Sequence, residues 1–144
     1  MFSVELSNTA EEFDSIIKLR YDVLRQPWNQ SIATATDELE TTSVNAFIKN
    51  KQGNVVACGR LQESENKVGQ IRYMAVAENL RGEGLGKKIL LYLEQKASEK
   101  KFLKIELQAR ENAVDFYKSC GYTVKEQSFL LWGIIQHFLM EKEL

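Results

Sequence analysis

The stretch from Gln70 to Lys101 restricts the fold of this chain more than any other segment. It opens with a strand-like run, Ile71 to Val76, and continues through a short loop into Arg81-Gly82-Glu83-Gly84-Leu85-Gly86. A helix is predicted next, because apolar residues recur every four positions and so share one face. These residues are Leu85, Ile89, Leu93 and Ala97. A strand, a glycine-rich turn and a helix in this order predict an anion site at the start of the helix.

The physical basis of that prediction is the helix N-terminus. The first helical N–H groups have no internal partner, and the helix dipole adds partial positive charge at the same end. Glycines at 82, 84 and 86 remove the Cβ atoms that would hold an anion away from those groups. Arg81 and Lys87 place full positive charges beside them. An ordinary tight turn is the alternative reading of the glycines taken alone.

The loop does not match the two common nucleotide motifs. A dinucleotide fingerprint needs a third glycine where this chain has Lys87. A Walker A loop needs glycine at the position of Arg81 and serine or threonine at the position of Lys88.

The rest of the chain predicts one α/β domain over residues 1–144. A helix begins after Thr9 and ends before Pro27, and a helical turn is expected over Thr36–Leu39. A right-handed crossover joins the strand ending at Val76 to a parallel strand at Phe102–Leu107. The other expected elements are strands at Ser3–Leu6, Val44–Lys49, Val55–Leu61, Val68–Val76, Tyr122–Lys125 and Ile134–Met140, and a short helix at Asn112–Ser119. This order gives a mixed sheet with helices on both faces.

Composition excludes several classes of protein. The formal net charge of −1 gives no reason to expect a nucleic-acid or membrane partner. Cys58 and Cys120 are far apart in no metal spacing, so we expect reduced thiols, no metal and a cytoplasmic protein. The start of the chain does not read as a signal peptide, and the longest apolar run, Phe129–Ile135, is too short to cross a bilayer.

The loop R-G-x-G-x-G after a strand ending Met-Ala-Val resembles the pyrophosphate loop of the GNAT superfamily of N-acetyltransferases. The element order resembles that family over nearly the whole chain. The resemblance implies a sheet splayed between strands 4 and 5, with acetyl-CoA as the co-substrate. The pantetheine arm would pair with the strand ending at Val76, and a backbone N–H near Val76 would polarise the thioester carbonyl. The implied coenzyme contacts are Met74, Ala75, Val76, Arg81, Gly82, Glu83, Gly84, Leu85, Gly86, Lys87, Asn112 and Phe116.

Two further residues are implied as catalytic. Phe116-Tyr117 before Cys120-Gly121-Tyr122 resembles the family segment whose tyrosine protonates the leaving thiolate. Spacing alone favours Tyr117 as a residue on the inner face of an amphipathic helix, and the catalytic role comes from the resemblance. His137, the only histidine, is either a structural strand residue or the base that takes the proton of the amine.

Within the superfamily the chain resembles small-molecule acetyltransferases of the glyphosate N-acetyltransferase kind. The shared pieces are Leu19-Arg20 with Leu24-Arg25, Arg72-Tyr73-Met74-Ala75, Ala109-Arg110 and His137-Phe138-Leu139-Met140. The resemblance implies that Arg25, Arg72 and Arg110 hold an acidic acceptor, since guanidinium forks bind carboxylate or phosphonate. Salt-bridged or solvated arginines are the alternative.

The segment before His137 departs from that subgroup. Phe129 to Gln136 is strongly apolar and contains Trp132, which either lines the acceptor pocket or belongs to a homodimer interface. With Trp28, it points to an acceptor that is larger and less charged than a phosphono amino acid.

The sequence therefore predicts an N-acetyltransferase that moves acetyl to the primary or secondary amine of a small, acidic molecule by direct attack in a ternary complex. A protein or peptide N-acetyltransferase is the alternative within the same class. A non-catalytic acetyl-CoA-binding module is the alternative outside it.

Overall fold

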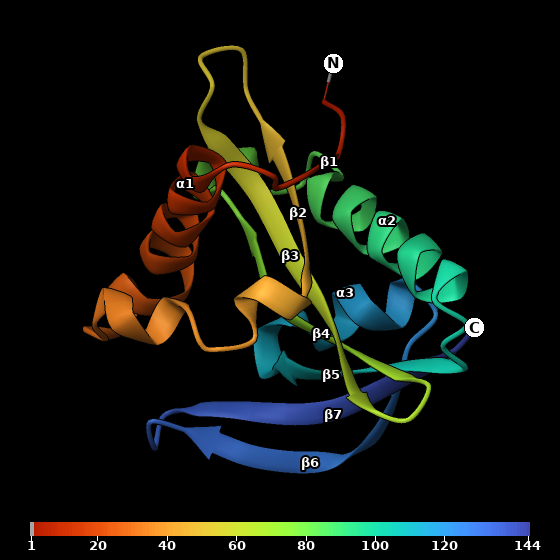
Figure 1. The fold of residues 1–144 in the computed structure, drawn as a ribbon. Coiled ribbons are helices and arrows are strands. Elements are labelled where there is room, and N and C mark those ends of the chain that lie inside the picture. The colour runs from red at the N-terminus through yellow and green to blue at the C-terminus, as the bar shows by residue number, and fades with distance from the viewer. Residues whose placement is uncertain (1) are drawn as a thin grey trace.

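The computed structural model describes residues 2–144 as one mixed sheet with helices on both faces (Figure 1). The seven strands run in the order β1-β2-β3-β4-β5-β7-β6, and only β4 and β5 are parallel neighbours. The strands are β1 (Glu5–Leu6), β2 (Val44–Lys49), β3 (Val55–Glu65), β4 (Val68–Val76), β5 (Lys104–Arg110), β6 (Thr123–Leu131) and β7 (Ile135–Glu143). The helices are α1 (Ala10–Arg20), α2 (Leu85–Glu99) and α3 (Val114–Ser119). The predicted α/β class and parallel crossover are confirmed.

The two faces of the sheet carry separate apolar clusters because strand side chains alternate. Ala46 and Ile48 of β2 pack in the cluster that includes α2, while Phe47 between them packs with Ile16 and Leu19 of α1. α1 and α2 therefore cover opposite faces, on either side of the sheet in Figure 1. α3 lies on the α2 face, since its Tyr117 belongs to the same cluster as α2.

The apolar stripe predicted for α2 forms its buried side. Leu85, Ile89, Leu93 and Ala97 are all at most 2% exposed. Burying three such large side chains stabilises the domain by roughly 1.5–3 kcal/mol each. This packing fixes α2 across β3 and so fixes where its N-terminus lies.

The first helix also begins as predicted. The Thr9 hydroxyl accepts a hydrogen bond from the Glu12 backbone N–H at 3.1 Å. After α1 the chain widens into a π turn, Tyr21–Arg25, and a 3₁₀ turn, Gln26–Trp28, that contains Pro27. The π turn was not predicted, and it turns Leu24 and Arg25 toward the sheet.

Several predicted boundaries are wrong. Thr36–Leu39 is not helical, and 3₁₀ turns lie on either side of it at Ile32–Ala35 and Glu40–Thr42. β3 runs four residues beyond Leu61, because its polar end still pairs with β4. β5 starts at Lys104 rather than Phe102 and extends to Arg110, because β7 pairs with it over that whole length. The remaining 3₁₀ turns are Glu78–Leu80 and Glu111–Ala113.

No helix within residues 2–144 has both the length and the apolar character needed to cross a membrane.

A substitution at Gly59 tests the close packing of α2 on β3. A Cβ added there would lie 2.5 Å from Met74 Sδ and 2.7 Å from Ile89 Cγ2. We expect Gly59→Ala to lower the free energy of unfolding by about 1–3 kcal/mol in urea titrations, because the core would be overpacked. In a Met74→Ala background the same change should cost clearly less. Equal costs in both backgrounds would contradict the packing described.

Candidate active site

The sheet opens between β4 and β5. The two strands pair from Val68 with Lys104 to Ile71 with Leu107, and no pair follows, although each strand continues to Val76 or Arg110. The Ala77 N–H donates to Val56 O of β3 at 2.8 Å. Because successive N–H groups of a strand point to opposite sides, those of Met74 and Val76 face the opening. An extended, amide-bearing ligand can pair with them as an added strand would.

A β-bulge marks the place where β4 leaves β5. Tyr73 and Met74 together oppose Gly59, since Arg60 pairs with Arg72 and Cys58 pairs with Ala75. Tyr73 has a φ of 55°, the left-handed conformation that the first residue of a G1 bulge adopts. The bulge bends β4 and places the Tyr73 ring on the α1 face.

The glycine-rich loop lies at the N-terminus of α2, as predicted. Gly82 and Gly84 have φ values of 85° and 80°, which glycine adopts without strain. The first helical hydrogen bond runs from Lys88 N–H to Gly84 O, so the N–H groups of residues 85–87 have no helical partner. A Cβ at Gly86 would approach Phe116 to 3.4 Å and Val76 to 3.5 Å, which shows how closely β4, α2 and α3 converge here. Free N–H groups and the exposed Arg81 and Lys87 fit a pyrophosphate.

Tyr117 is buried on α3, with its ring edge-on to Phe116 and Tyr122. Its hydroxyl makes no hydrogen bond within residues 2–144. Only Arg20 Nε and Arg60 Nε are fully buried without a partner there, so this hydroxyl is not sealed in the core. Burial raises the pKa of Tyr117, which keeps it protonated at neutral pH.

His137 of β7 pairs with Arg110 of β5, so both side chains lie on the α1 face. His137 Nδ1 lies 3.0 Å from Ile135 O, a contact that requires hydrogen on Nδ1 and leaves Nε2 as a free acceptor. The Phe129 ring stacks on the imidazole at 4.4 Å. Burial, together with the charges of Arg110 and Arg25, lowers the pKa of His137. The imidazole is therefore neutral at neutral pH and able to take a proton.

Arg25 and Arg110 meet beside His137. Both guanidinium groups donate to Leu24 O at 3.0 Å, and Arg25 also donates to Thr34 O at 3.2 Å. Neither forms an ion pair with a carboxylate of the described chain. Burial lowers the pKa of both, and for Arg110 burial and the nearby Arg25 lower it to about 10. Two half-desolvated cations without a counter-ion are costly, and this arrangement favours an anionic ligand.

A family model for "Acetyltransferase (GNAT) family" matches residues 11–122. The chain belongs to that family. It is 26% identical over 138 residues to the uncharacterized N-acetyltransferase YjcF of Bacillus subtilis (strain 168), which covers 96% of this chain and 97% of that protein.

Solved structures share the fold over almost the full length. A protein from Lactobacillus plantarum superposes with a TM-score of 0.87 at 21% identity, covering 99% of this chain and 98% of that one. A GNAT acetyltransferase from Elizabethkingia anophelis, solved with acetyl-CoA bound, gives 0.76 at 18% identity and covers 99% and 98%. As a member of the GNAT acetyltransferase family, the chain is an acyltransferase that uses acetyl-CoA. Among residues 2–144, no three His, Cys, Asp or Glu side chains gather as metal ligands.

The GNAT fold brings part of the predicted coenzyme set together, since Gly86 lies close to Phe116 and Val76. Met74, Ala75 and Val76 lie on the β4 wall of the opening, and Phe116 lies against Gly86. Leu85 is buried at the start of α2, while Glu83 and Asn112 are exposed. The contacts of these residues with the coenzyme stay predictions.

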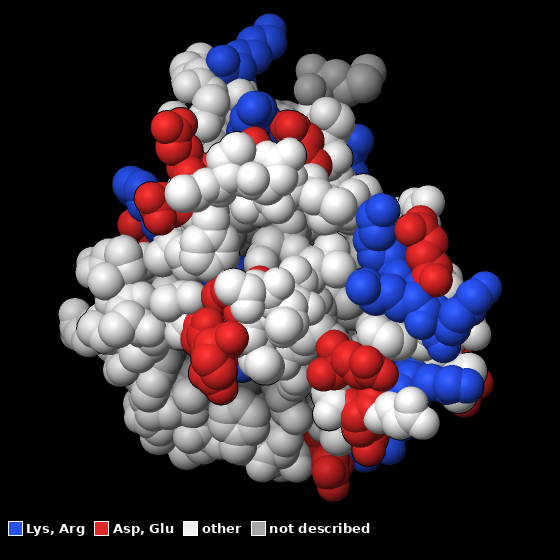
Figure 2. All heavy atoms as spheres, viewed as in Figure 1, with Lys and Arg blue, Asp and Glu red and all other residues white. Residues whose placement is uncertain are grey.

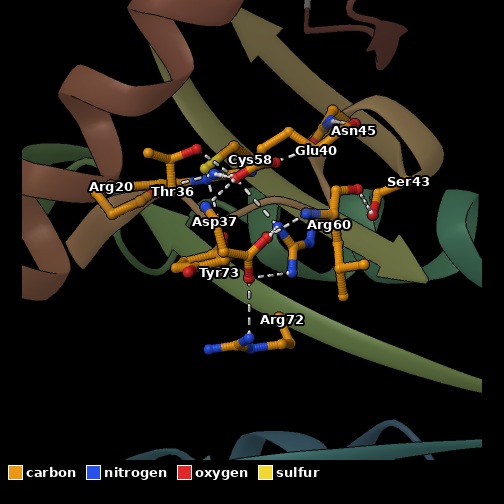
Figure 3. Close-up of polar contacts among 12 residues, drawn as sticks. Arg20, Thr36, Asp37, Glu40, Ser43, Asn45, Cys58, Arg60, Arg72 and Tyr73 are labelled. Carbon is orange, nitrogen blue, oxygen red and sulfur yellow. Dashed lines mark hydrogen bonds and ion pairs between the residues drawn. The ribbon is translucent and has the colours of Figure 1, made fainter. Parts of the chain in front are cut away.

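A partly buried ion network of the acetyltransferase was not predicted (Figure 3). Asp37 accepts from both guanidinium nitrogens of the buried Arg60, at 2.8 and 2.9 Å, and from Arg72 at 3.2 Å. Hydrogen bonds from Arg60 lower the pKa of Asp37 to about 2. Glu40 pairs with the buried Arg20 at 2.8 Å. Arg72, predicted to hold substrate, is thus already paired and 41% exposed.

All of these arginines except Arg110 surround one ring. The guanidinium carbons of Arg20, Arg25, Arg60 and Arg72 lie 4.3–5.6 Å from the Tyr73 ring centre. Four of the six arginines of the chain therefore gather around this ring, and within residues 2–144 the carboxylates that pair with them are Asp37 and Glu40. The sequence feature that pointed to this region is the repeated Leu-Arg pair, Leu19-Arg20 and Leu24-Arg25.

The single histidine permits a direct test of this electrostatic environment. We expect the His137 ring protons to titrate in NMR spectra with a midpoint below about 6.5, the ordinary value. Arg110→Gln should raise that midpoint, whereas Lys104→Gln, at the other end of β5, should leave it unchanged. Because the pKa of His137 is lower in the folded than in the unfolded protein, the free energy of unfolding is highest above pH 6.5. It falls as the pH drops through the folded pKa, since the unfolded protein then binds the proton more readily. A midpoint at or above 6.5 would contradict the burial described.

Proposed function

We propose that this acetyltransferase moves the acetyl group of acetyl-CoA to the amine of a small, acid-bearing molecule by direct attack with both substrates bound. One observation carries the proposal: Arg25 and Arg110, which have no carboxylate partner within residues 2–144, lie beside the neutral His137. An acceptor whose acid binds the guanidinium pair presents its amine near a base. The superfamily subgroup of the glyphosate enzymes, suggested by sequence, agrees with this proposal.

The two substrates reach the reaction from opposite faces of the sheet. Tyr117 lies on the α2 face, while Arg110 and His137 lie on the α1 face. An intact sheet would separate them. The opening beyond Ile71 and Leu107 lets them face one space, because no strand pairing closes it.

The donor is held by backbone groups. Acetyl-CoA supplies the thioester, and the Met74 and Val76 N–H groups are positioned to bind its extended arm and carbonyl oxygen. The free N–H groups after Gly84, with Arg81 and Lys87, bind the pyrophosphate. Donors that are fixed in advance stabilise charge developing on an oxygen without reorganisation.

Proton transfer is assigned to two side chains. His137 Nε2 takes the proton from the amine as the N–C bond forms, because Nδ1 is committed to Ile135 O. Tyr117 gives its proton to the departing sulfur, because its raised pKa keeps the hydroxyl protonated until a thiolate needs it.

An acyl-enzyme step through cysteine does not fit this arrangement. Burial raises the pKa of Cys58 to about 11, so it is not a thiolate at neutral pH. Cys120 is half-buried at the end of α3, with the Ser119 hydroxyl beside its sulfur and no histidine there. Attack is therefore assigned to the amine itself.

The acceptor class is tested by thiol release from acetyl-CoA with a panel of amines. The panel holds amino acids, phosphono amino acids, amino sugars, polyamines and a lysine peptide. We expect turnover with acid-bearing small amines only, and a loss of about 10²-fold or more in kcat/KM in Arg110→Gln, because a charge-assisted contact is removed. Lys104→Gln is the matched charge control and should behave as wild type. Turnover on polyamines or peptide, unaffected by Arg110→Gln, would overturn the proposal.

The proton-transfer assignment is tested separately. Tyr117→Phe and His137→Gln should each lower kcat by about 10²–10⁴-fold, the usual range for a general acid or base. The affinity for acetyl-CoA, measured by calorimetry, should change little, because neither residue lies at the phosphate loop. Tyr92→Phe, a half-buried tyrosine of α2, controls for loss of a hydroxyl. Unchanged turnover in both variants would leave a coenzyme-binding module as the better description.

A further inference from the structure

The turn that joins β6 to β7 carries an unusual residue for its conformation. Trp132 and Gly133 have φ values of 52° and 72°, and Ile134 N–H donates to Leu131 O at 3.0 Å, as in a type I′ turn. The first central position of a type I′ turn, here Trp132, favours asparagine or glycine. A large aromatic residue is strained there. Strain of this kind persists where neighbouring contacts hold it and often marks a functional position.

The Trp132 ring lies against both members of the arginine pair. It lies 5.3 Å from the Arg25 guanidinium carbon and 6.0 Å from that of Arg110. Trp28, from the turn after α1, lies 4.5 Å from the same Arg110 carbon and 6.4 Å from Trp132. Two indoles, brought from distant parts of the chain, therefore flank the two guanidinium groups that have no carboxylate partner in the described part of the chain.

Both indoles are only half-buried, so part of each ring remains available to a ligand. The rest of the hairpin end is apolar and exposed, with Leu130 at 52% and Ile134 at 63%. In Figure 2 the lower left, where the turns after α1 and the hairpin end lie in Figure 1, shows no charged side chain. An aliphatic dicarboxylate would leave these indoles unused.

We infer that Trp28 and Trp132 select an acceptor in which the acid group adjoins a flat, apolar body, such as an aryl ring. The acid binds Arg25 and Arg110, and the flat body stacks on the exposed indole surface. This inference rests on the proposed function for the amine, and it makes Trp132 a specificity-determining residue. Strong positive charge at the site excludes flat cationic ligands.

The inference is tested by binding, since Trp28 and Trp132 are the only tryptophans and their fluorescence reports on this site alone. The probes are L-phenylalanine and L-leucine, which share acid and amine and have similar apolar area. We expect phenylalanine to bind about five-fold more tightly than leucine, in line with the extra energy of aromatic pairs beyond area burial. Equal dissociation constants, or no binding of phenylalanine, would overturn the inference.

A turn-compatible variant separates stacking from folding. Trp132→Asn creates the Asn-Gly pair that type I′ turns prefer, so the hairpin should form and thermal unfolding should occur within a few degrees of wild type. Its preference for phenylalanine, measured by calorimetry, should fall to about one, while the leucine constant is unchanged. Trp132→Phe should restore most of the preference. Equal weakening of both probes in Trp132→Asn would assign Trp132 to the fold rather than to selection.

The binding comparison and the thiol-release panel together separate this inference from the proposed function. If phenylalanine is preferred but acetyl-CoA releases no thiol with any amine, the proposed function fails and the selection by the indoles stands. If acid-bearing amines are acetylated with no preference for a flat body, the inference fails alone.

Discussion

The loss of pairing between β4 and β5 is the constraint on which the rest of the site depends. Strands that stay paired leave no backbone donor free, whereas here Met74 and Val76 keep theirs. The bulge at Tyr73 coincides with the break, and an extra residue in β4 bends the strand away from its parallel neighbour. One local irregularity thus leaves an edge of β4 with free backbone N–H groups and an opening between the two faces of the sheet.

The strain of the bulge is balanced by an arginine cluster. A tyrosine in the left-handed conformation costs about 1 kcal/mol or more. Four guanidinium groups lie around its ring, each contributing roughly 0.5–2 kcal/mol according to its desolvation. Asp37 and Glu40 neutralise Arg20, Arg60 and Arg72 only in part. Arg25 and Arg110 form no ion pair within residues 2–144, so the cluster that stabilises the bulge continues into a region of unneutralised positive charge beside His137.

The parts that were predictable from sequence are local or periodic. The apolar period of α2, the glycines before it and the cap at Thr9 are each specified within a few residues, and the structure has them as expected. The ion network was not predictable, because Asp37 meets Arg60 across an irregular segment where no periodicity restricts the partners. The helical turn expected at Thr36–Leu39 was wrong for the same reason, since the carboxylate of Asp37 is held by Arg60 instead. The contact of Trp28 with Trp132 depends on the π turn after α1, and no local sequence pattern predicted that turn.

Residue-resolved hydrogen exchange with and without acetyl-CoA tests most directly the claim that this opening binds the donor. The account predicts that the amides of Met74 and Val76 and those of residues 85–87 become protected when acetyl-CoA is added, while the exposed strand β6 does not change. Protection confined to β6, or none at Met74 and Val76 under conditions where acetyl-CoA is shown by calorimetry to be bound, would contradict it.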